Sequence, residues 1–282
     1  MGKFSEALKK SESVRNEPSP KPTPKKVVNI SPETIDALKL DTTATQGPAE
    51  ELPLPRGGMD PRLASFLEVA SPAVESFKML RAKILTTDSK SRPRTIMVTS
   101  PQPLDGKTTL AVNLAINIAQ GINEYVMLVD CDLRRASVDR YLGLNAHKGI
   151  REYLEEGTSV APYLARTFME KLTVLPAGKP VPNPSELLSS EKMQLLVEEL
   201  RGRYKDRYII FDATPAQFAA ETTFLASMVD GVLLVVRSGK TAENMLLEAV
   251  ENIGRDRIFG LVFNASNESH KSYRYYYRYY QK

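Results

Sequence analysis

The chain has 282 residues, of which 42% are hydrophobic, and its 38 Lys and Arg against 34 Asp and Glu give a formal net charge of +4. This length allows one large domain or two small ones, while the single cysteine, Cys131, excludes a disulfide framework and a cysteine-rich zinc site. No apolar run approaches the ~18 residues that a membrane span needs, and the first residues lack the apolar core of a signal peptide, so we expect a cytoplasmic protein.

Residues 1–58 have the composition of a leader or linker. Eight of the 19 prolines fall there, including the run PSPKPTPKK at 18–26. Such a segment cannot bury enough apolar surface to offset the entropy lost on ordering. We therefore predict a disordered, Pro-rich leader over 1–58, a folded domain over 59–269 and a tyrosine-rich tail over 270–282.

Basic residues concentrate at the two ends of the chain. Residues 1–30 and 271–282 each carry a net charge of +4, so the middle of the chain sums to −4. A globular part without excess positive charge does not favour a large nucleic-acid-binding face, and we expect no nucleic acid partner.

From residue 71 onward, amphipathic segments alternate with short apolar runs. Near-continuous apolar strands that alternate with helices predict an α/β fold, with a mostly parallel sheet covered by helices on both faces. In such a sheet the functional residues gather at the carboxyl ends of the strands. The predicted strands are 95–99, 125–130, 172–175, 207–212, 231–236 and 258–264, and the predicted helices are 71–87, 108–120, 136–141, 147–156, 184–201, 218–227 and 242–254.

The first strand runs into SPQPLDGKTT over 100–109, a sequence typical of a phosphate-binding loop that leads into a helix. Backbone N–H groups and the helix N-terminus attract phosphate oxygens. Gly106 permits close backbone approach, Lys107 would reach the β- and γ-phosphates, and the Thr108 hydroxyl would ligate Mg²⁺. Pro101 replaces the first glycine of the usual pattern, so a chance Gly-Lys-Thr is the alternative. The predicted nucleotide-binding residues of the loop are Pro103, Leu104, Asp105, Gly106, Lys107, Thr108 and Thr109.

Two further strands end in carboxylates. Asp130 and Asp132 lie at the end of the strand 125–130, and Asp212 ends the strand 207–212. Carboxylates at the end of a buried strand are costly without a cation, which Mg²⁺–nucleotide would supply. One carboxylate could hold metal or its water, and another could accept a proton from an incoming hydroxyl. A surface turn with a local salt bridge is the structural alternative, but together with the loop these residues predict a Mg-dependent nucleoside triphosphate site.

Six of the 12 tyrosines lie within eight residues of the tail and are interleaved with basic residues. The tail has three interpretations: a final strand or exposed end, a stacking surface for single-stranded nucleic acid, or a cluster of phosphate acceptors. A tyrosine hydroxyl has a pKa of about 10 and needs a nearby base to attack a phosphoryl group. Asp130 or Asp132 could be that base, while Lys107 and Mg²⁺ neutralise the developing charge. The candidate acceptors are Tyr273, Tyr275, Tyr276, Tyr277, Tyr279 and Tyr280.

Five segments within about residues 70–282 carry a family resemblance. They are PLDGKTT, DCDLRR, IIFDATP, the stretch from Pro176-Ala177-Gly178 to PNPSELL, and the tyrosine-rich tail. In combination they resemble the bacterial tyrosine kinases, or BY-kinases, of capsule and exopolysaccharide biosynthesis, which are related to the partition-type P-loop ATPases. The resemblance implies a P-loop NTPase fold, with ATP and Mg²⁺ as cofactors.

The resemblance also implies roles for the strand-end residues. The loop around Gly106 and Lys107 is similar to the family's Walker A motif, Asp130 and Asp132 lie where its second acidic motif, Walker A′, lies, and Asp212 matches its Walker B aspartate. On this basis the catalytic residues would be Lys107, Asp130 and Asp132, and the metal-holding residues would be Thr108, Asp130 and Asp212.

Two other matches lie away from these motifs. Asn264, at the end of the last predicted strand, is placed like a residue that contacts adenine in related ATPases. Glu75, Lys78 and Arg81 resemble the family's oligomerisation helix E-x-x-R-x-x-R, with Lys in the first Arg position.

The implied function is an ATP-dependent protein-tyrosine autokinase that phosphorylates its own tail between subunits and regulates capsule or exopolysaccharide polymerisation or export. The implied partners are other copies of the chain in a ring or dimer, a separate membrane activator of the polysaccharide co-polymerase type, and a cognate tyrosine phosphatase. The activator would recruit the chain to the inner face of the plasma membrane.

Two alternatives to a kinase remain. A partition-type ATPase is disfavoured by Gln102, because those proteins carry a second lysine early in the loop. A nucleotide-gated scaffold without kinase activity is suggested by Leu104, which stands where the family has a glycine. A non-glycine residue with positive φ costs about 1 kcal/mol or more, so we expect either a different loop conformation or a lower nucleotide affinity.

Overall fold

The computed structural model describes residues 60–63, 72–87, 92–218 and 220–266. All of them belong to one compact unit, Glu51–Lys282. The predicted leader over 1–58 and the predicted tail over 270–282 lie outside the described residues. Among the helices that the structure describes, none combines the length and the apolar character needed to cross a bilayer.

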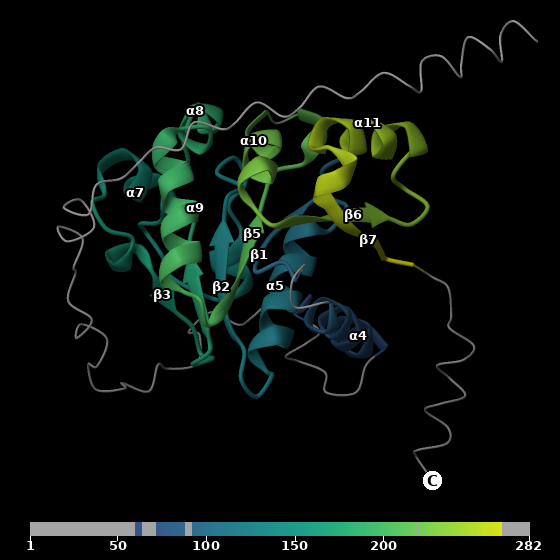
Figure 1. Ribbon diagram of the computed structural model, residues 1–282, viewed down its shortest axis with the longest axis horizontal. Coiled ribbons are helices and arrows are strands. Elements are labelled where there is room, and N and C mark those ends of the chain that lie inside the picture. The colour runs from purple at the N-terminus through teal and green to yellow at the C-terminus, as the bar shows by residue number, and fades with distance from the viewer. Residues whose placement is uncertain (1–59, 64–71, 88–91, 219, 267–282) are drawn as a thin grey trace, which may run out of the picture. The chain divides into compact units, whose positions relative to one another are not determined.

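A seven-stranded sheet forms the centre of this unit, in the order β3-β4-β2-β5-β1-β6-β7 (Figure 1). Every pair of neighbouring strands is parallel except β3 and β4. The predicted mostly parallel α/β fold is therefore confirmed. The strands are β1 (Thr95–Thr99), β2 (Tyr125–Asp130), β3 (Ala165–Arg166), β4 (Leu172–Leu175), β5 (Arg207–Asp212), β6 (Gly231–Arg237) and β7 (Ile258–Asn264).

Helices cover both faces of the sheet, and each face has its own apolar core (Figure 1). One core lies between the sheet and α5, with α4 and α6 at its margin, and the other lies beneath α7 to α11. Because both faces are covered, every residue of β1 is buried, which explains why its three central residues are all apolar. The helices are α4 (Pro72–Thr86), α5 (Lys107–Ala119), α6 (Val138–Tyr141), α7 (Ile150–Glu156), α8 (Pro184–Leu188), α9 (Glu191–Arg203), α10 (Ala220–Met228) and α11 (Glu243–Ile253).

One predicted helix is wrong, because residues 184–201 form two helices, α8 and α9, instead of one. The Ser190 hydroxyl accepts the N–H of Met193 and caps α9, and a serine that caps a new helix ends the preceding one. Strand β3 was not predicted, because two residues are too few to leave a pattern. The other predicted strands and helices are present, with ends within three residues of those expected.

Asp230, immediately before β6, holds the start of β1. Its Oδ2 accepts the N–H groups of Arg94 and Thr95, both at 2.9 Å, and its Oδ1 lies 3.0 Å from Nη2 of Arg201. Burial alone would raise the pKa of this carboxyl, but the hydrogen bonds from Thr95 and Arg94, together with the Arg201 charge, outweigh it and hold the pKa below its usual range. The ionised carboxylate therefore stabilises the folded state.

We expect Asp230→Asn to lower the free energy of unfolding at pH 7 by about 1 kcal/mol, because the amide is a weaker acceptor for two N–H groups and loses its attraction to Arg201. As the pH falls through the folded-state pKa, the parent carboxylate is protonated and its contribution is lost. The difference between the two proteins should therefore shrink as the pH falls below about 4.

Urea denaturation across this pH range measures the difference, and Asp256→Asn, a change at an exposed carboxylate, is the matched control. A difference for Asp230→Asn that stays constant with pH would contradict this account of Asp230.

Candidate active site

The predicted phosphate loop and the three predicted carboxylates lie at the carboxyl ends of β1, β2 and β5, which are neighbours in the sheet. The loop 100–106 leaves β1 and enters α5, while Asp130 ends β2 and Asp212 ends β5. Asp130 and Asp212 are direct partners in the β2–β5 register, and the N–H of Cys131 continues this ladder to the Asp212 carbonyl at 2.8 Å. The sheet thus gathers residues that are far apart in the sequence onto one edge.

The loop 100–106 needs left-handed backbone at two positions. Gly106 has φ +96° and precedes α5, and a Cβ at this position would lie 2.1 Å from Nδ2 of Asn264. Leu104 has φ +68° and is 80% exposed. The loop therefore keeps positive φ at the position where glycine was expected, at a strain of about 1 kcal/mol.

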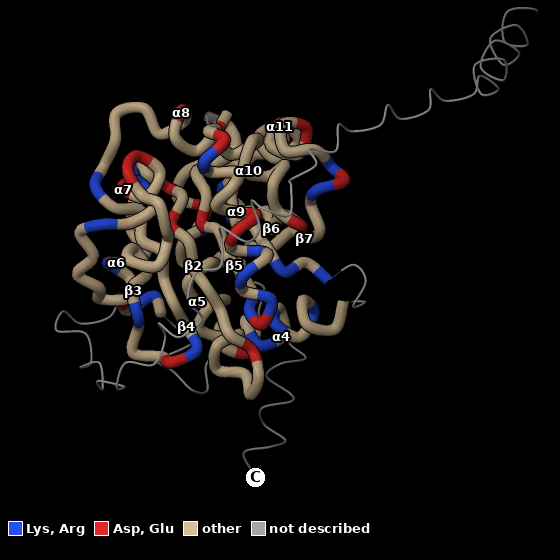
Figure 2. The backbone as a smooth tube through the Cα atoms, turned by 60° about the vertical axis from the view of Figure 1, so that its left-hand side comes forward, with Lys and Arg blue, Asp and Glu red and all other residues tan. Residues whose placement is uncertain are grey.

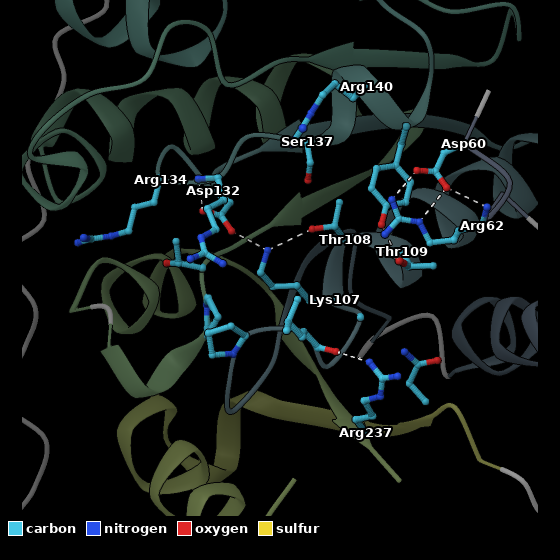
Figure 3. Close-up of a pocket in the computed structure, with 18 of the residues that line it drawn as sticks. Asp60, Arg62, Lys107, Thr108, Thr109, Asp132, Arg134, Ser137, Arg140 and Arg237 are labelled. Atoms are coloured by element: carbon cyan, nitrogen blue, oxygen red, sulfur yellow. Dashed lines mark hydrogen bonds and ion pairs between the residues drawn. The ribbon is translucent and has the colours of Figure 1, made fainter. Parts of the chain in front are cut away.

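The Lys107 ammonium lies at the centre of the site (Figure 3). Its Nζ donates to Asp132 Oδ2 at 2.7 Å and to Thr108 Oγ1 at 3.1 Å, and it lies 3.7 Å from Asp212 Oδ1. Burial alone would lower the pKa of the ammonium, but the charges of Asp212 and Asp132 outweigh burial and raise that pKa. Lys107 therefore remains a cation at neutral pH.

Asp212 is buried, and only one of its two carboxylate oxygens accepts a hydrogen bond from the described residues. Its Oδ2 accepts the Thr108 hydroxyl at 2.6 Å, whereas its buried Oδ1 accepts no hydrogen bond from the described part of the chain. Burial raises the pKa of the Asp212 carboxyl in spite of Lys107 and Thr108. Buried carboxylate oxygens usually accept a hydrogen bond or bind a cation, and the described side chains donate no hydrogen bond to Oδ1.

Asp130 differs from the other carboxylates, because backbone N–H groups occupy both its oxygens. Oδ1 accepts from Asp132 at 3.1 Å, and Oδ2 accepts from Ser137 at 3.1 Å and Val138 at 3.2 Å. Burial, followed by the charge of Asp212, raises the pKa of Asp130 to about 8. These contacts suit a carboxylate that shapes the turn after β2, and the catalytic and metal-holding roles of Asp130 stay predictions.

The oxygen atoms that fit Mg²⁺ are the Thr108 hydroxyl and Oδ1 of Asp212, which accepts no hydrogen bond from the described residues. Both are hard oxygen ligands, and Mg²⁺ in proteins is usually held by one or two carboxylates together with substrate phosphates and water. Across the described ranges there is no group of three or more His, Cys, Asp and Glu arranged around a metal position. A magnesium ion here would complete its coordination shell from phosphate and water.

A cavity of about 830 Å³ opens over Lys107 and Thr108 (Figure 3). Lys and Arg are spread over the whole domain (Figure 2), but the cavity lining is locally positive. Such a cavity attracts anions and has the size of a small-molecule site. Its basic side chains are Arg62, Lys107, Arg134, Arg135, Arg140 and Arg237, and its acidic side chains are Asp60 and Asp132.

One wall of the cavity, formed by residues 60–63 against α6, was not predicted from the sequence. Asp60 binds the Arg62 guanidinium through both carboxylate oxygens (Figure 3). This guanidinium lies 4.5 Å from the centre of the Tyr141 ring. The Tyr141 hydroxyl lies 2.9 Å from Thr109 Oγ1, in the first turn of α5. Leu63 is fully buried and anchors the segment. No local pattern could have indicated these contacts.

A second unpredicted feature fixes Arg134 after Asp132. The Arg134 Nε donates to the buried Glu221 at 3.1 Å and its Nη2 donates to Ser185 at 3.2 Å, while the Ser185 hydroxyl donates to Glu221 at 2.6 Å. The turn after β2 is thereby bonded to α8 and α10. The sequence singled out the arginines and the segment PNPSELL, but not the contact between them.

The structure brings most of the predicted nucleotide-binding residues to the cavity. Asp105 is the exception, since it is buried and accepts from Thr241 and Gln102 instead. Asn264 reaches the cavity, but its Nδ2 donates to the Asp105 carbonyl at 2.8 Å. The predicted residues that line the cavity are Pro103, Leu104, Gly106, Lys107, Thr108, Thr109 and Asn264.

The predicted oligomerisation residues lie apart from the cavity, on α4. Glu75 and Lys78 form an ion pair at 2.7 Å, and Arg81 donates from Nη1 to the Asn117 carbonyl of α5 at 2.9 Å. Their proposed role between subunits stays a prediction. The six tail tyrosines lie outside the described residues.

Comparison with known proteins finds clear relatives. The chain is similar to tyrosine-protein kinase YwqD of Bacillus subtilis, with 31% identity over 221 residues that cover 77% of this chain and 92% of YwqD. It is also similar to the solved BceF tyrosine kinase domain, with 30% identity, a TM-score of 0.63 and coverage of 71% of this chain and 81% of that one. For the kinase domain of Escherichia coli tyrosine kinase ETK the identity is 25%, the TM-score is 0.66 and the coverages are 76% and 85%. No family model matches the chain.

A more distant likeness concerns the fold alone. The septum site-determining protein MinD from Pyrococcus horikoshii, solved in complex with Mg-ADP, is 18% identical with a TM-score of 0.52, over 63% of this chain and 72% of MinD. The fold of the described domain is accordingly shared by the BceF and ETK kinase domains and by MinD.

Because burial opposes ionisation of Asp212, we expect Asp212→Asn to raise the free energy of unfolding of the ligand-free protein at pH 8 by about 1 kcal/mol. A raised folded-state pKa means that the folded carboxyl holds a proton that the unfolded chain releases above about pH 4. The free energy of unfolding of the parent should therefore fall as the pH rises from about 4 to 8. The difference in this free energy between the variant and the parent should vanish near pH 4.

Urea denaturation gives the stability, and melting temperatures with and without Mg²⁺ and ATP give the response to ligand, which the variant should lose. Asp256→Asn, at an exposed carboxylate, should change neither quantity. A variant that is less stable than the parent at pH 8 would mean that the ionised Asp212 stabilises the fold.

Proposed function

We propose that this chain, which belongs to the bacterial tyrosine kinase family, is an autokinase that transfers the γ-phosphoryl group of ATP to tyrosines of its own tail. The observation that carries the proposal is the convergence of Lys107, Thr108, Asp132 and Asp212 on one edge of the sheet, beneath an anion-attracting cavity. The proposed acceptors are Tyr273, Tyr275, Tyr276, Tyr277, Tyr279 and Tyr280.

In the proposed reaction, a tyrosine oxygen attacks the γ-phosphorus, the bond from this phosphorus to the β,γ-bridging oxygen breaks, and ADP leaves. The phenol proton passes to Asp132, because this carboxylate lines the cavity while Asp130 and Asp212 do not. Lys107 stabilises the negative charge that develops on the transferred group and on ADP. A magnesium ion held through Thr108 and Asp212 would supply further positive charge against the phosphate oxygens.

Electrostatics suggests an order of binding. The tail carries Lys271, Arg274, Arg278 and Lys282 with no acidic residue over 271–282, and the cavity lining is also basic. Like charges repel, so the tail should enter poorly while the cavity holds no nucleotide. The phosphates of ATP reduce the positive charge of the lining, and we therefore propose that ATP binds before the tail.

We also propose the setting in which the kinase acts. The kinase domain spans 59–269 and the substrate tail 270–282, in a cytoplasmic chain that forms a ring or dimer. A separate membrane activator of the polysaccharide co-polymerase type recruits it to the inner face of the plasma membrane, and a cognate tyrosine phosphatase reverses its modification. The cycle would regulate polymerisation or export of a capsule or exopolysaccharide, in keeping with the family to which the chain belongs.

Incubation with γ-labelled ATP and Mg²⁺, followed by phosphopeptide mapping, tests the kinase proposal. The parent should label its tail peptide, and Lys107→Met should lose at least about 100-fold of the label, because methionine has an unbranched side chain of similar size without the charge. Lys148→Met, at an exposed lysine outside the cavity, should label like the parent.

The same experiment separates the alternatives. Free phosphate without labelled protein would indicate a partition-type ATPase, whereas ATP binding with neither product would indicate a nucleotide-gated scaffold. Either result would refute the autokinase proposal.

A mixing experiment tests transfer between subunits. Lys107→Met keeps an intact tail, whereas a variant with all six tail tyrosines changed to Phe keeps an intact site, so neither should label alone. When the two are mixed, the tail of the Lys107→Met protein should become labelled at a rate that rises with protein concentration. No labelling in the mixture, combined with a concentration-independent rate for the parent, would place the transfer within one subunit.

A further inference from the structure

Two consecutive carbonyls of the phosphate loop are held by side chains from neighbouring strands. Arg237, the last residue of β6, donates from Nη1 to the Leu104 carbonyl at 2.9 Å (Figure 3), and Asn264, the last residue of β7, donates from Nδ2 to the Asp105 carbonyl at 2.8 Å. Arg237 and Asn264 are partners in the β6–β7 register. Both donors therefore come from one corner of the sheet.

These bonds determine the direction of two N–H groups. A trans peptide is planar and points its C=O and N–H in opposite directions. Holding the Leu104 carbonyl toward Arg237 turns the N–H of Asp105 the other way, and holding the Asp105 carbonyl toward Asn264 does the same for the N–H of Gly106. Successive N–H groups that share a direction form a concave site for phosphate oxygens.

Leu104 is the strained residue of the phosphate loop. Its φ of +68° lies in the region that residues with a Cβ rarely adopt, and its side chain is 80% exposed, so side-chain packing does little to fix it. In the described part of the chain, the bond from Arg237 is the one hydrogen bond made by the Leu104 peptide carbonyl. Asn264 and Thr241 hold the next residue, Asp105, whereas Arg237 acts on the Leu104 peptide itself.

The donor is itself fixed in place. The backbone N–H of Arg237 donates to Thr241 Oγ1 at 2.9 Å, and the Thr241 hydroxyl donates to the buried Asp105 side chain at 2.9 Å. The N–H of Ser238 donates to the Asn264 carbonyl at 2.9 Å. The turn between β6 and α11 and the phosphate loop are thus bonded as one unit.

We propose that Arg237 is a positioning residue, which holds Leu104 in the left-handed conformation and thereby orients the phosphate loop for its ligand. Arg237 supports at this position a conformation that glycine would adopt unaided. The inference rests on the proposed function, because the ligand for which the loop is oriented is the phosphate chain of ATP.

A double-mutant cycle between Arg237→Ala and Leu104→Gly tests the proposal, with the affinity for ATP and Mg²⁺ measured by calorimetry. Arg237→Ala should weaken binding about fivefold to tenfold when residue 104 is leucine. With Leu104→Gly in the same chain, it should weaken binding less than about twofold, because glycine needs no support at positive φ.

Equal weakening in both backgrounds would overturn the proposal, because Arg237 would then act on the ligand directly through its charge. Arg255→Ala, at an exposed arginine beyond the cavity lining, removes the same charge and should leave the affinity unchanged.

A second measurement needs no nucleotide. The ¹³C shifts of Leu104 report the sign of φ, and in the ligand-free protein they should move away from left-handed values in Arg237→Ala but not in Arg255→Ala. Unmoved Leu104 shifts would refute the positioning role. A parent that binds no ATP would instead refute the proposed function, while the Leu104 shifts would still decide whether Arg237 holds the loop.

Discussion

One ammonium group shared among buried carboxylates is the constraint on which the rest of the site depends. Lys107 is bonded to Asp132 and lies close to Asp212, at the edge where β1, β2 and β5 end. Asp130 is held separately, by backbone N–H groups of the turn after β2. In this buried cluster Lys107 is the cation that faces Asp132 and Asp212, whereas the arginines line the cavity. Burial raises the pKa of Asp130 and Asp212, and a carboxyl with a raised folded-state pKa costs stability in the ligand-free fold at neutral pH. Such a cost is common where function and stability compete.

The sheet and the centre of the site could be predicted because both depend on local sequence. Each of β1, β2 and β5 is an apolar run that leads directly into the residues that the sheet gathers on one edge, namely the loop before Lys107, then Asp130 and Asp212. The only additional premise is that parallel strands present their carboxyl ends on the same edge. The prediction failed at Ser190 because helical periodicity continues across a capping serine, and the break depends on which hydrogen bond that serine makes.

The remaining features of the site come from contacts between distant parts of the chain. Arg237 and Leu104 are 133 positions apart, and Arg134 and Glu221 are 87 positions apart. In neither case does one residue constrain the type of the other in a way that a single sequence reveals. Leu104 shows what a single sequence cannot reveal. The sequence shows that leucine stands where a glycine was expected, but whether the loop keeps its conformation depends on Arg237, a side chain from another strand. The replacement of a motif glycine is therefore weak evidence that a binding site has been lost, unless the contacts of the replacing residue are known.

Residues 60–63 set a lower limit on how short an active fragment of this protein can be. Leu63 is buried in the core on the α5 side of the sheet, the N–H of Asp60 donates to the Tyr141 carbonyl, and Arg62 forms part of the cavity wall. A fragment trimmed to the first residue of α4 would retain the whole sheet and every motif, yet it would lack one side of its ligand cavity. A fragment whose first residue is chosen from the secondary structure alone would therefore lack the cavity wall that Asp60 and Arg62 form.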